Sequence, residues 1–192
     1  MLNNGQNLVS WFRDDPLPLI TKDPAVIVGG KSLLREFLGT ILEDSNGGNL
    51  TIAVPFIGPG LAVPDFWEAM NHAGIDLRLV VRGKKDAKEA AHFLRGFPWR
   101  SLQICRSPRL HAKLYIFEKS SGGGSVLVGS HNLSRSAAET NHEAGVLIVT
   151  RQTGFYSSII TNVCEAARTI IAGAKIIFDS SRWLSGAVNS KG

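Results

Sequence analysis

Strand-type and helix-type segments alternate through the first half of the chain, and this order constrains the fold more than any other feature. Short apolar runs are separated by longer segments whose apolar residues recur at helical spacing. The predicted strands are 49–57, 75–81 and 101–106, and the predicted helices are 31–44, 64–74 and 85–96. Strands joined through helices in this way pair in parallel, with the helices packed on the faces of the sheet.

The second half of the chain adds elements of a different kind. They are a predicted hairpin at 110–134, a strand at 143–150 and a long helix at 154–173 that ends in glycine. We therefore expect an α/β fold with a mixed, mainly parallel sheet, flanked by helices on both faces. The length of 192 residues fits a single domain. The expected divisions are an N-terminal arm at 1–24, a folded domain at 25–178 and a C-terminal tail at 179–192.

Composition excludes several classes of protein. Hydrophobic residues make up 44% of the chain and charged residues 19%, which is typical of a globular protein. No apolar run approaches the roughly 20 residues that span a bilayer, and no secretory signal is visible, so we expect a cytoplasmic protein without stable membrane association. Cys105 and Cys164 are expected to be buried free thiols. No metal-binding spacing is present, and we expect no metal or cofactor.

Positive charge is concentrated just before the hairpin. Residues 74–113 contain ten Lys or Arg against three Asp or Glu, a net charge of +7 in a chain of net charge +5. The remainder of the chain is therefore slightly acidic. A localised basic surface favours a polyanionic partner such as nucleic acid, although a merely solvated basic face would give the same pattern. Arg106 and Arg109, immediately before the hairpin, are the predicted substrate-binding residues.

Polar side chains occupy the two ends of the hairpin that an antiparallel turn at 119–125 would bring together. His111 and Lys113 are two residues apart and share a face of their strand, as do Ser130 and Asn132 of the other strand. An imidazole, an ammonium group, a hydroxyl and a carboxamide at one place suit a phosphate group. A polar sheet end without chemistry is the alternative.

Two carboxylates lie near this motif in the sequence. Glu118 has the opposite parity to His111, so we expect it to point away and to be structural. Glu143 opens the next strand and is a candidate to orient a catalytic imidazole. We expect His131 to face away from Ser130 and Asn132. For His142, a solvent or structural contact is favoured over a substrate contact.

The remaining histidines and most aromatic residues have simpler interpretations. His72 and His92 fall in predicted helices and are expected at the surface or in packing. Five aromatic residues are expected to pack in the core rather than to stack on bases: Phe56, Phe66, Trp67, Phe93 and Phe97. Trp99 and Trp183 lie beside turns, where the sequence favours neither role.

In combination, "HAKLYIFE", "GSHN" and "NHEAG" resemble the HKD signature of the phospholipase D superfamily. The element order resembles the family over 31–173 and the motif over 110–147. In this chain Glu118 stands where the family has Asp, and ten residues rather than about six separate it from Gly129. The exchange keeps the charge, and the longer gap fits an extended hairpin tip.

The resemblance implies a metal-independent phosphodiesterase. His111 would attack phosphorus to form a phosphohistidine, and Lys113 and Asn132, supported by Ser130, would hold the phosphoryl oxygens. A second histidine would protonate the leaving oxygen and then activate water. The chain has a single HxK motif, so a homodimer would have to supply that second histidine.

The short, single-motif relatives that this chain resembles are nucleases, which include secreted bacterial endonucleases and the nuclease domains of certain restriction enzymes. The predicted function is therefore hydrolysis of nucleic acid, DNA in preference to RNA. The alternatives are a phospholipid hydrolase or transferase of the same chemistry and a non-catalytic DNA-binding module of a restriction or helicase system.

Overall fold

The computed structural model describes residues 25–29, 33–42, 47–58, 64–134, 136–137, 141–150 and 157–180. The expected arm at 1–24 and nearly all of the expected tail lie outside these residues. The strands are β1 (Ala25–Gly29), β2 (Gly48–Val54), β3 (Ile75–Val81), β4 (Leu102–Arg106), β5 (Leu114–Lys119), β6 (Gly124–Gly129), β7 (Gly145–Thr150) and β8 (Lys175–Asp179). The helices are α2 (Leu33–Leu42), α3 (Pro64–His72), α4 (Lys84–Leu94) and α6 (Ser157–Ile171). In the described residues, no helix is long and apolar enough to cross a membrane.

All eight strands form one sheet in the order β1-β7-β6-β5-β2-β3-β4-β8. The expected α/β class and mixed sheet are correct, but the expectation of a mainly parallel sheet is wrong. Only β2, β3 and β4 pair in parallel, through the α3 and α4 connections, and every other pair is antiparallel. The hairpin returns beside β2 rather than beside β4, and two edge strands that sequence analysis did not predict, β1 and β8, also run antiparallel.

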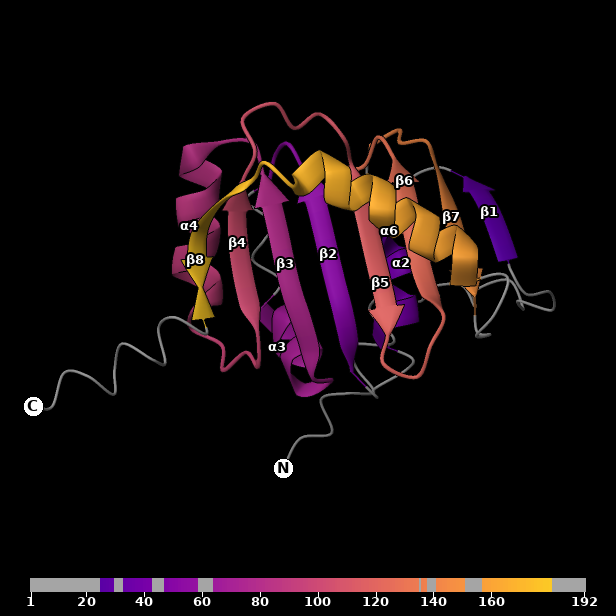
Figure 1. Cartoon of the computed structure of the whole chain (residues 1–192), viewed down its shortest axis with the longest axis horizontal. Helices are drawn as coiled ribbons and strands as arrows, with labels where there is room; N and C mark the ends of the chain where they lie inside the picture. Colours follow the sequence, from indigo (N-terminus) through magenta and orange to yellow (C-terminus); the bar gives the residue numbers. More distant parts are fainter. Residues whose placement is uncertain are drawn as a thin grey trace, which may run out of the picture.

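Helices cover both faces of the sheet, as expected. In Figure 1, α6 crosses the near face, whereas α2, α3 and α4 lie behind the sheet. The larger core cluster packs the sheet against these three helices and includes Phe37, Trp67 and Phe117. The smaller cluster packs Cys164 and Ala167 of α6 against the other face. Cys105 and Cys164 are buried free thiols, as predicted.

The alternation of apolar residues explains how one strand serves both clusters. In β5, Tyr115 and Phe117 belong to the larger cluster, and Leu114 and Ile116 belong to the cluster under α6. Leu110 and Ala112 precede the strand and pack with the α6 cluster, so the alternation extends back to 110. Strand β5 itself begins only at Leu114. His111 therefore lies in the irregular segment just before the strand rather than within it.

Glycines form the tip of the hairpin. Gly122, Gly123 and Gly124 all have positive φ, with values of 94°, 76° and 151°. A Cβ atom at Gly124 would lie 1.9 Å from the carbonyl oxygen of Phe117, so the tight return to β6 requires glycine there. The segment 119–125 therefore forms the predicted hairpin turn.

The core is the place where a single truncation should be most damaging. We predict that Phe117→Ala destabilises the protein by about 3–5 kcal/mol, because it removes a fully buried ring from the larger cluster. Phe56→Ala, at a ring that is 49% exposed, should change the free energy of unfolding by only about 0.5 kcal/mol. Urea unfolding monitored by circular dichroism compares the two variants. Equal destabilisation by both changes would contradict this account of the core.

Candidate active site

Pairing of β5 with β6 brings the two halves of the motif together. Leu114 pairs with Val128, and the Gly129 N–H donates to the carbonyl oxygen of Lys113 at 3.3 Å. His111–Lys113 and the 129–132 segment are therefore neighbours at one edge of the sheet, the upper edge in Figure 1. Strands β2, β3 and β4 end at this edge, and it is called the motif edge below. The predicted convergence of the hairpin ends is confirmed.

His111 and Lys113 differ in their surroundings. His111 is exposed, and its imidazole forms no hydrogen bond with another described residue. Lys113 is half-buried beside Gly129. The imidazole is thus accessible to a ligand from solvent, whereas the Lys113 side chain is partly covered by the protein. Accessibility of this kind is what a nucleophile requires, although the role of each residue stays a prediction.

Ser130 and Glu143 form the best-defined polar contact at the motif edge. The Ser130 hydroxyl donates to Glu143 Oε2 and accepts from the Ala144 N–H at 3.0 Å. Asn141 donates from Nδ2 to the other carboxylate oxygen at 3.2 Å. Glu143 therefore fixes the Ser130 hydroxyl, and among the described residues it makes no hydrogen bond to His111. Its predicted role in orienting an imidazole stays a prediction.

Asn132 carries a polar atom that the protein leaves available. Its side-chain oxygen is buried and has no hydrogen-bond partner among the described residues. Buried polar atoms are nearly always paired, so such an atom beside a polar motif suits contact with a ligand.

A buried tyrosine and a buried histidine support the motif from below, and sequence analysis missed both roles. Tyr115 is fully buried and donates from its hydroxyl to the carbonyl oxygen of His131 at 3.1 Å. The His131 ring is itself fully buried and lies against Gly129 and Gly145, where Cβ atoms would come within 2.9 and 3.1 Å of it. The sequence did contain one indication: Tyr115 is two residues after Lys113, so alternation places both side chains on the same face of the chain.

Arginines line the same edge. Arg106 ends β4 and is half-buried, and its Nε atom has no hydrogen-bond partner among the described residues. Arg109 is exposed in the following turn, which is fixed by hydrogen bonds from Ser107 to Val81 and from Leu110 to Ser107. Both predicted substrate-binding arginines therefore lie in the segment that leads directly into His111, although substrate binding itself stays a prediction.

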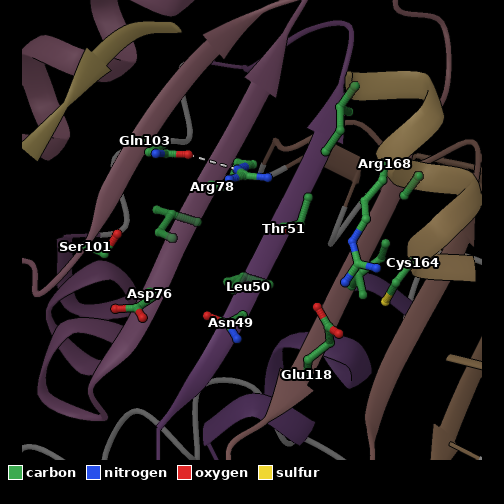
Figure 2. Close-up of a pocket in the computed structure, with 14 residues that line it drawn as sticks. Asn49, Leu50, Thr51, Asp76, Arg78, Ser101, Gln103, Glu118, Cys164 and Arg168 are labelled. Atoms are coloured by element: carbon green, nitrogen blue, oxygen red, sulfur yellow. Dashed lines mark hydrogen bonds between the residues drawn. The ribbon is translucent and has the colours of Figure 1, made fainter. Parts of the chain in front are cut away.

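Glu118 lies on the α6 face of β5, as its parity predicted, and far along the strand from the motif edge. It pairs with Asn49 and Gly124 near the other end of β5. There it lines a groove of about 290 Å³ beneath α6, together with Cys164 and Arg168 (Figure 2). Burial, and then the charge of Glu118, raise the pKa of the Cys164 thiol to about 12. The groove is lined by none of the four polar residues His111, Lys113, Ser130 and Asn132, so the open motif edge is the better candidate site.

The other histidines also follow expectation. His72 and His92 are exposed on α3 and α4, where they contact the carbonyl oxygen of Glu68 and the guanidinium of Arg95. His142 is exposed beside Glu143. Trp67 and Trp99 are buried, and Phe93 and Phe97 pack against the core. Phe56 is the exception: its ring is 49% exposed, so the prediction that it packs in the core is wrong. The Phe66 side chain and Trp183 lie outside the described residues.

Residues 43–162 match the family described as cardiolipin synthase, PLD-like domain. The match spans more than half of the chain and includes the whole hairpin and both carboxylates discussed above. The chain therefore belongs to the family of phospholipase D-like domains.

Solved structures with the same fold come from several bacteria. Nuc, a phospholipase D family member from Salmonella typhimurium, has a TM-score of 0.55 at 18% identity, covering 80% of this chain and 98% of that one. NucT from Helicobacter pylori has a TM-score of 0.52 at 14% identity, with the same coverage. Phosphatidylserine synthase from Haemophilus influenzae has a TM-score of 0.57 at 14% identity, covering 80% of this chain and 40% of that one. No curated protein is detectably similar in sequence.

The hydrogen bond from Tyr115 to His131 gives a test of how the motif is supported. Burial, and then the charge of Glu143, raise the pKa of Tyr115 well above its usual value of 10. We predict that Tyr115→Phe costs about 0.5–1.5 kcal/mol at neutral pH, because the His131 carbonyl loses its donor.

The same variant has a pH signature. A raised folded-state pKa contributes stability that is present below the unfolded-state pKa and lost as pH rises above it. The advantage of the wild type over Tyr115→Phe should therefore shrink above pH 10. Urea unfolding at a series of pH values measures the difference. An advantage that grows with alkaline pH would contradict the buried, neutral state of Tyr115.

Proposed function

We propose that the protein is a metal-independent phosphodiesterase that hydrolyses nucleic acid, DNA in preference to RNA, through a phosphohistidine intermediate. The observation that supports the proposal is the pairing of β5 with β6, which makes the chain segments that carry His111 and Lys113 neighbours of the 129–132 segment at an accessible end of the sheet. Arg106 and Arg109 lead into that edge, and phosphate contacts dominate the affinity of proteins for nucleic acid. Family membership supports phosphodiester chemistry.

The proposed reaction has two displacements. A ring nitrogen of His111 attacks phosphorus, the bond from phosphorus to the leaving oxygen breaks, and a second imidazole donates a proton to that oxygen. Water then attacks the phosphohistidine, the second imidazole takes the proton of the water, and the bond between nitrogen and phosphorus breaks. Lys113 and Asn132 stabilise the negative charge on the phosphoryl oxygens during both steps. Glu143 holds Ser130 in position beside them.

The second imidazole comes from His111 of another copy of the chain, since the sequence contains one HxK motif. An exposed apolar surface beside the motif edge supports such a dimer. Val28 is 77% exposed and Val128 is 48% exposed. Val146 of β7 pairs with Val28 of β1 on one side and with Val128 of β6 on the other, so the three side chains share one face of the sheet. Helix α6 covers Val126 but leaves Val128 uncovered, one residue from Gly129 of the motif. A two-fold contact here would place two motif edges close together.

Chelation tests the chemistry. We predict that plasmid DNA is cleaved in EDTA and that His111→Ala abolishes cleavage, because both proton transfer and nucleophilic attack use imidazoles. His92→Ala, at an exposed histidine on α4, serves as the matched control and should cleave normally. Agarose electrophoresis measures the products, and phosphatidylcholine vesicles are assayed in parallel. Activity that disappears in EDTA and returns with magnesium would contradict the proposed metal-independent mechanism. Hydrolysis of the vesicles alone would favour the phospholipid hydrolase.

Subunit mixing tests the shared site. When wild-type chains are refolded with an excess of His111→Ala chains, most wild-type chains enter mixed dimers in which one imidazole is missing. We predict that activity per wild-type chain falls by roughly 10²–10⁴-fold in those mixed dimers, the usual contribution of a positioned proton donor. An excess of His72→Ala chains should leave the activity unchanged. Full activity per wild-type chain in mixed dimers would mean that each chain holds a complete site.

A further inference from the structure

An exposed aromatic ring lies at the motif edge, where the proposed function gives it no role. Phe56 follows the end of β2 and is 49% exposed. The other large hydrophobic side chains exposed among the described residues are all aliphatic. The guanidinium carbon of Arg82 lies 4.2 Å from the centroid of the Phe56 ring, in a cation–π contact. A ring that is open to solvent and stacked with arginine offers a flat, cationic surface.

Backbone hydrogen bonds hold this pair beside the motif. The Arg82 N–H donates to the carbonyl oxygen of Pro55 at 3.4 Å, which joins the ends of β3 and β2. Two residues beyond Phe56, the Gly58 N–H donates to the carbonyl oxygen of Leu133 at 3.0 Å, and Ile57 forms a bridge to Leu133. Leu133 directly follows Asn132. The ring is thus carried by the segment that pairs with the end of the motif.

The chemistry of this surface points to a nucleobase. Bases stack on aromatic rings and on guanidinium planes, and each stacked base contributes substantial binding free energy. A base inside a duplex has both faces covered by its neighbours, so only an unpaired base can use the ring. We propose that Phe56 and Arg82 form a stacking platform for a base next to the scissile phosphate, and that the protein therefore binds single-stranded nucleic acid in preference to duplex. This inference rests on the proposed function, because it places the nucleic acid at the motif edge.

Binding measurements test the platform separately from catalysis. In the His111→Ala background, which cannot turn over, the affinity for a fluorescent single-stranded oligonucleotide is compared with that for the same sequence as a duplex. Phe56→Ala should weaken binding of the single strand by about 5- to 150-fold, the equivalent of ~1–3 kcal/mol for one stacked base, and should change duplex binding far less. Phe56→Tyr should bind nearly as the parent does, whereas Phe56→Leu, which keeps an apolar side chain without a ring, should resemble Phe56→Ala.

The guanidinium has its own control. Arg82→Gln should weaken single-strand binding, whereas Arg95→Gln, at an exposed arginine beyond the far end of α4, should have little effect. Equal losses for single strand and duplex in Phe56→Ala, or full binding by Phe56→Leu, would overturn the platform. Cleavage of bis(4-nitrophenyl) phosphate by wild-type protein reports on the proposed function independently. A failure of that cleavage with the binding pattern intact would refute the chemistry and leave the platform standing.

Discussion

The antiparallel pairing of β5 with β6 is the interaction on which the candidate site depends. It aligns Leu114 with Val128 and ties Lys113 to Gly129, so two motif halves separated by the whole hairpin meet at one edge. A shift of register by one residue would turn every side chain of the strand to the other face. His111 and Lys113 would then point toward the α6 side, away from their present surroundings. The buried residues Tyr115 and Phe117 prevent such a shift, because both must remain in the core.

Small residues and a buried ring set the shape of the edge itself. The His131 imidazole occupies the space that side chains at positions 129 and 145 would need. It therefore lies between the end of β6 and the start of β7. Of the residues on either side of His131, Ser130 is exposed and Asn132 is half-buried. The carboxylate of Glu143 then fixes the Ser130 hydroxyl. The polar groups of the edge thus depend on packing beneath them as much as on their own contacts.

Sequence analysis succeeded wherever short-range patterns decide the structure. Alternation placed His111 and Glu118 on opposite faces, and the glycine run identified the hairpin turn. It failed where the answer depends on distant partners. The return of β5 beside β2, and the short edge strands β1 and β8, have no local signature, so the sheet proved mainly antiparallel. The exposure of Phe56 was missed because apolar character predicts burial, whereas a residue just beyond the end of a strand can lie either way.

The glycine tip of the hairpin lies at the far end of β5 and β6 from the motif. The chain turns there through Gly122 and Gly123, and six residues of paired strand separate the turn from the catalytic candidates. A longer or shorter turn should therefore change only the tip of the hairpin, while the hydrogen bonds between β5 and β6 preserve the geometry of the motif. The tip is accordingly a permissive position, at which relatives could acquire extra recognition segments and an experimenter could insert a label without disturbing the chemistry.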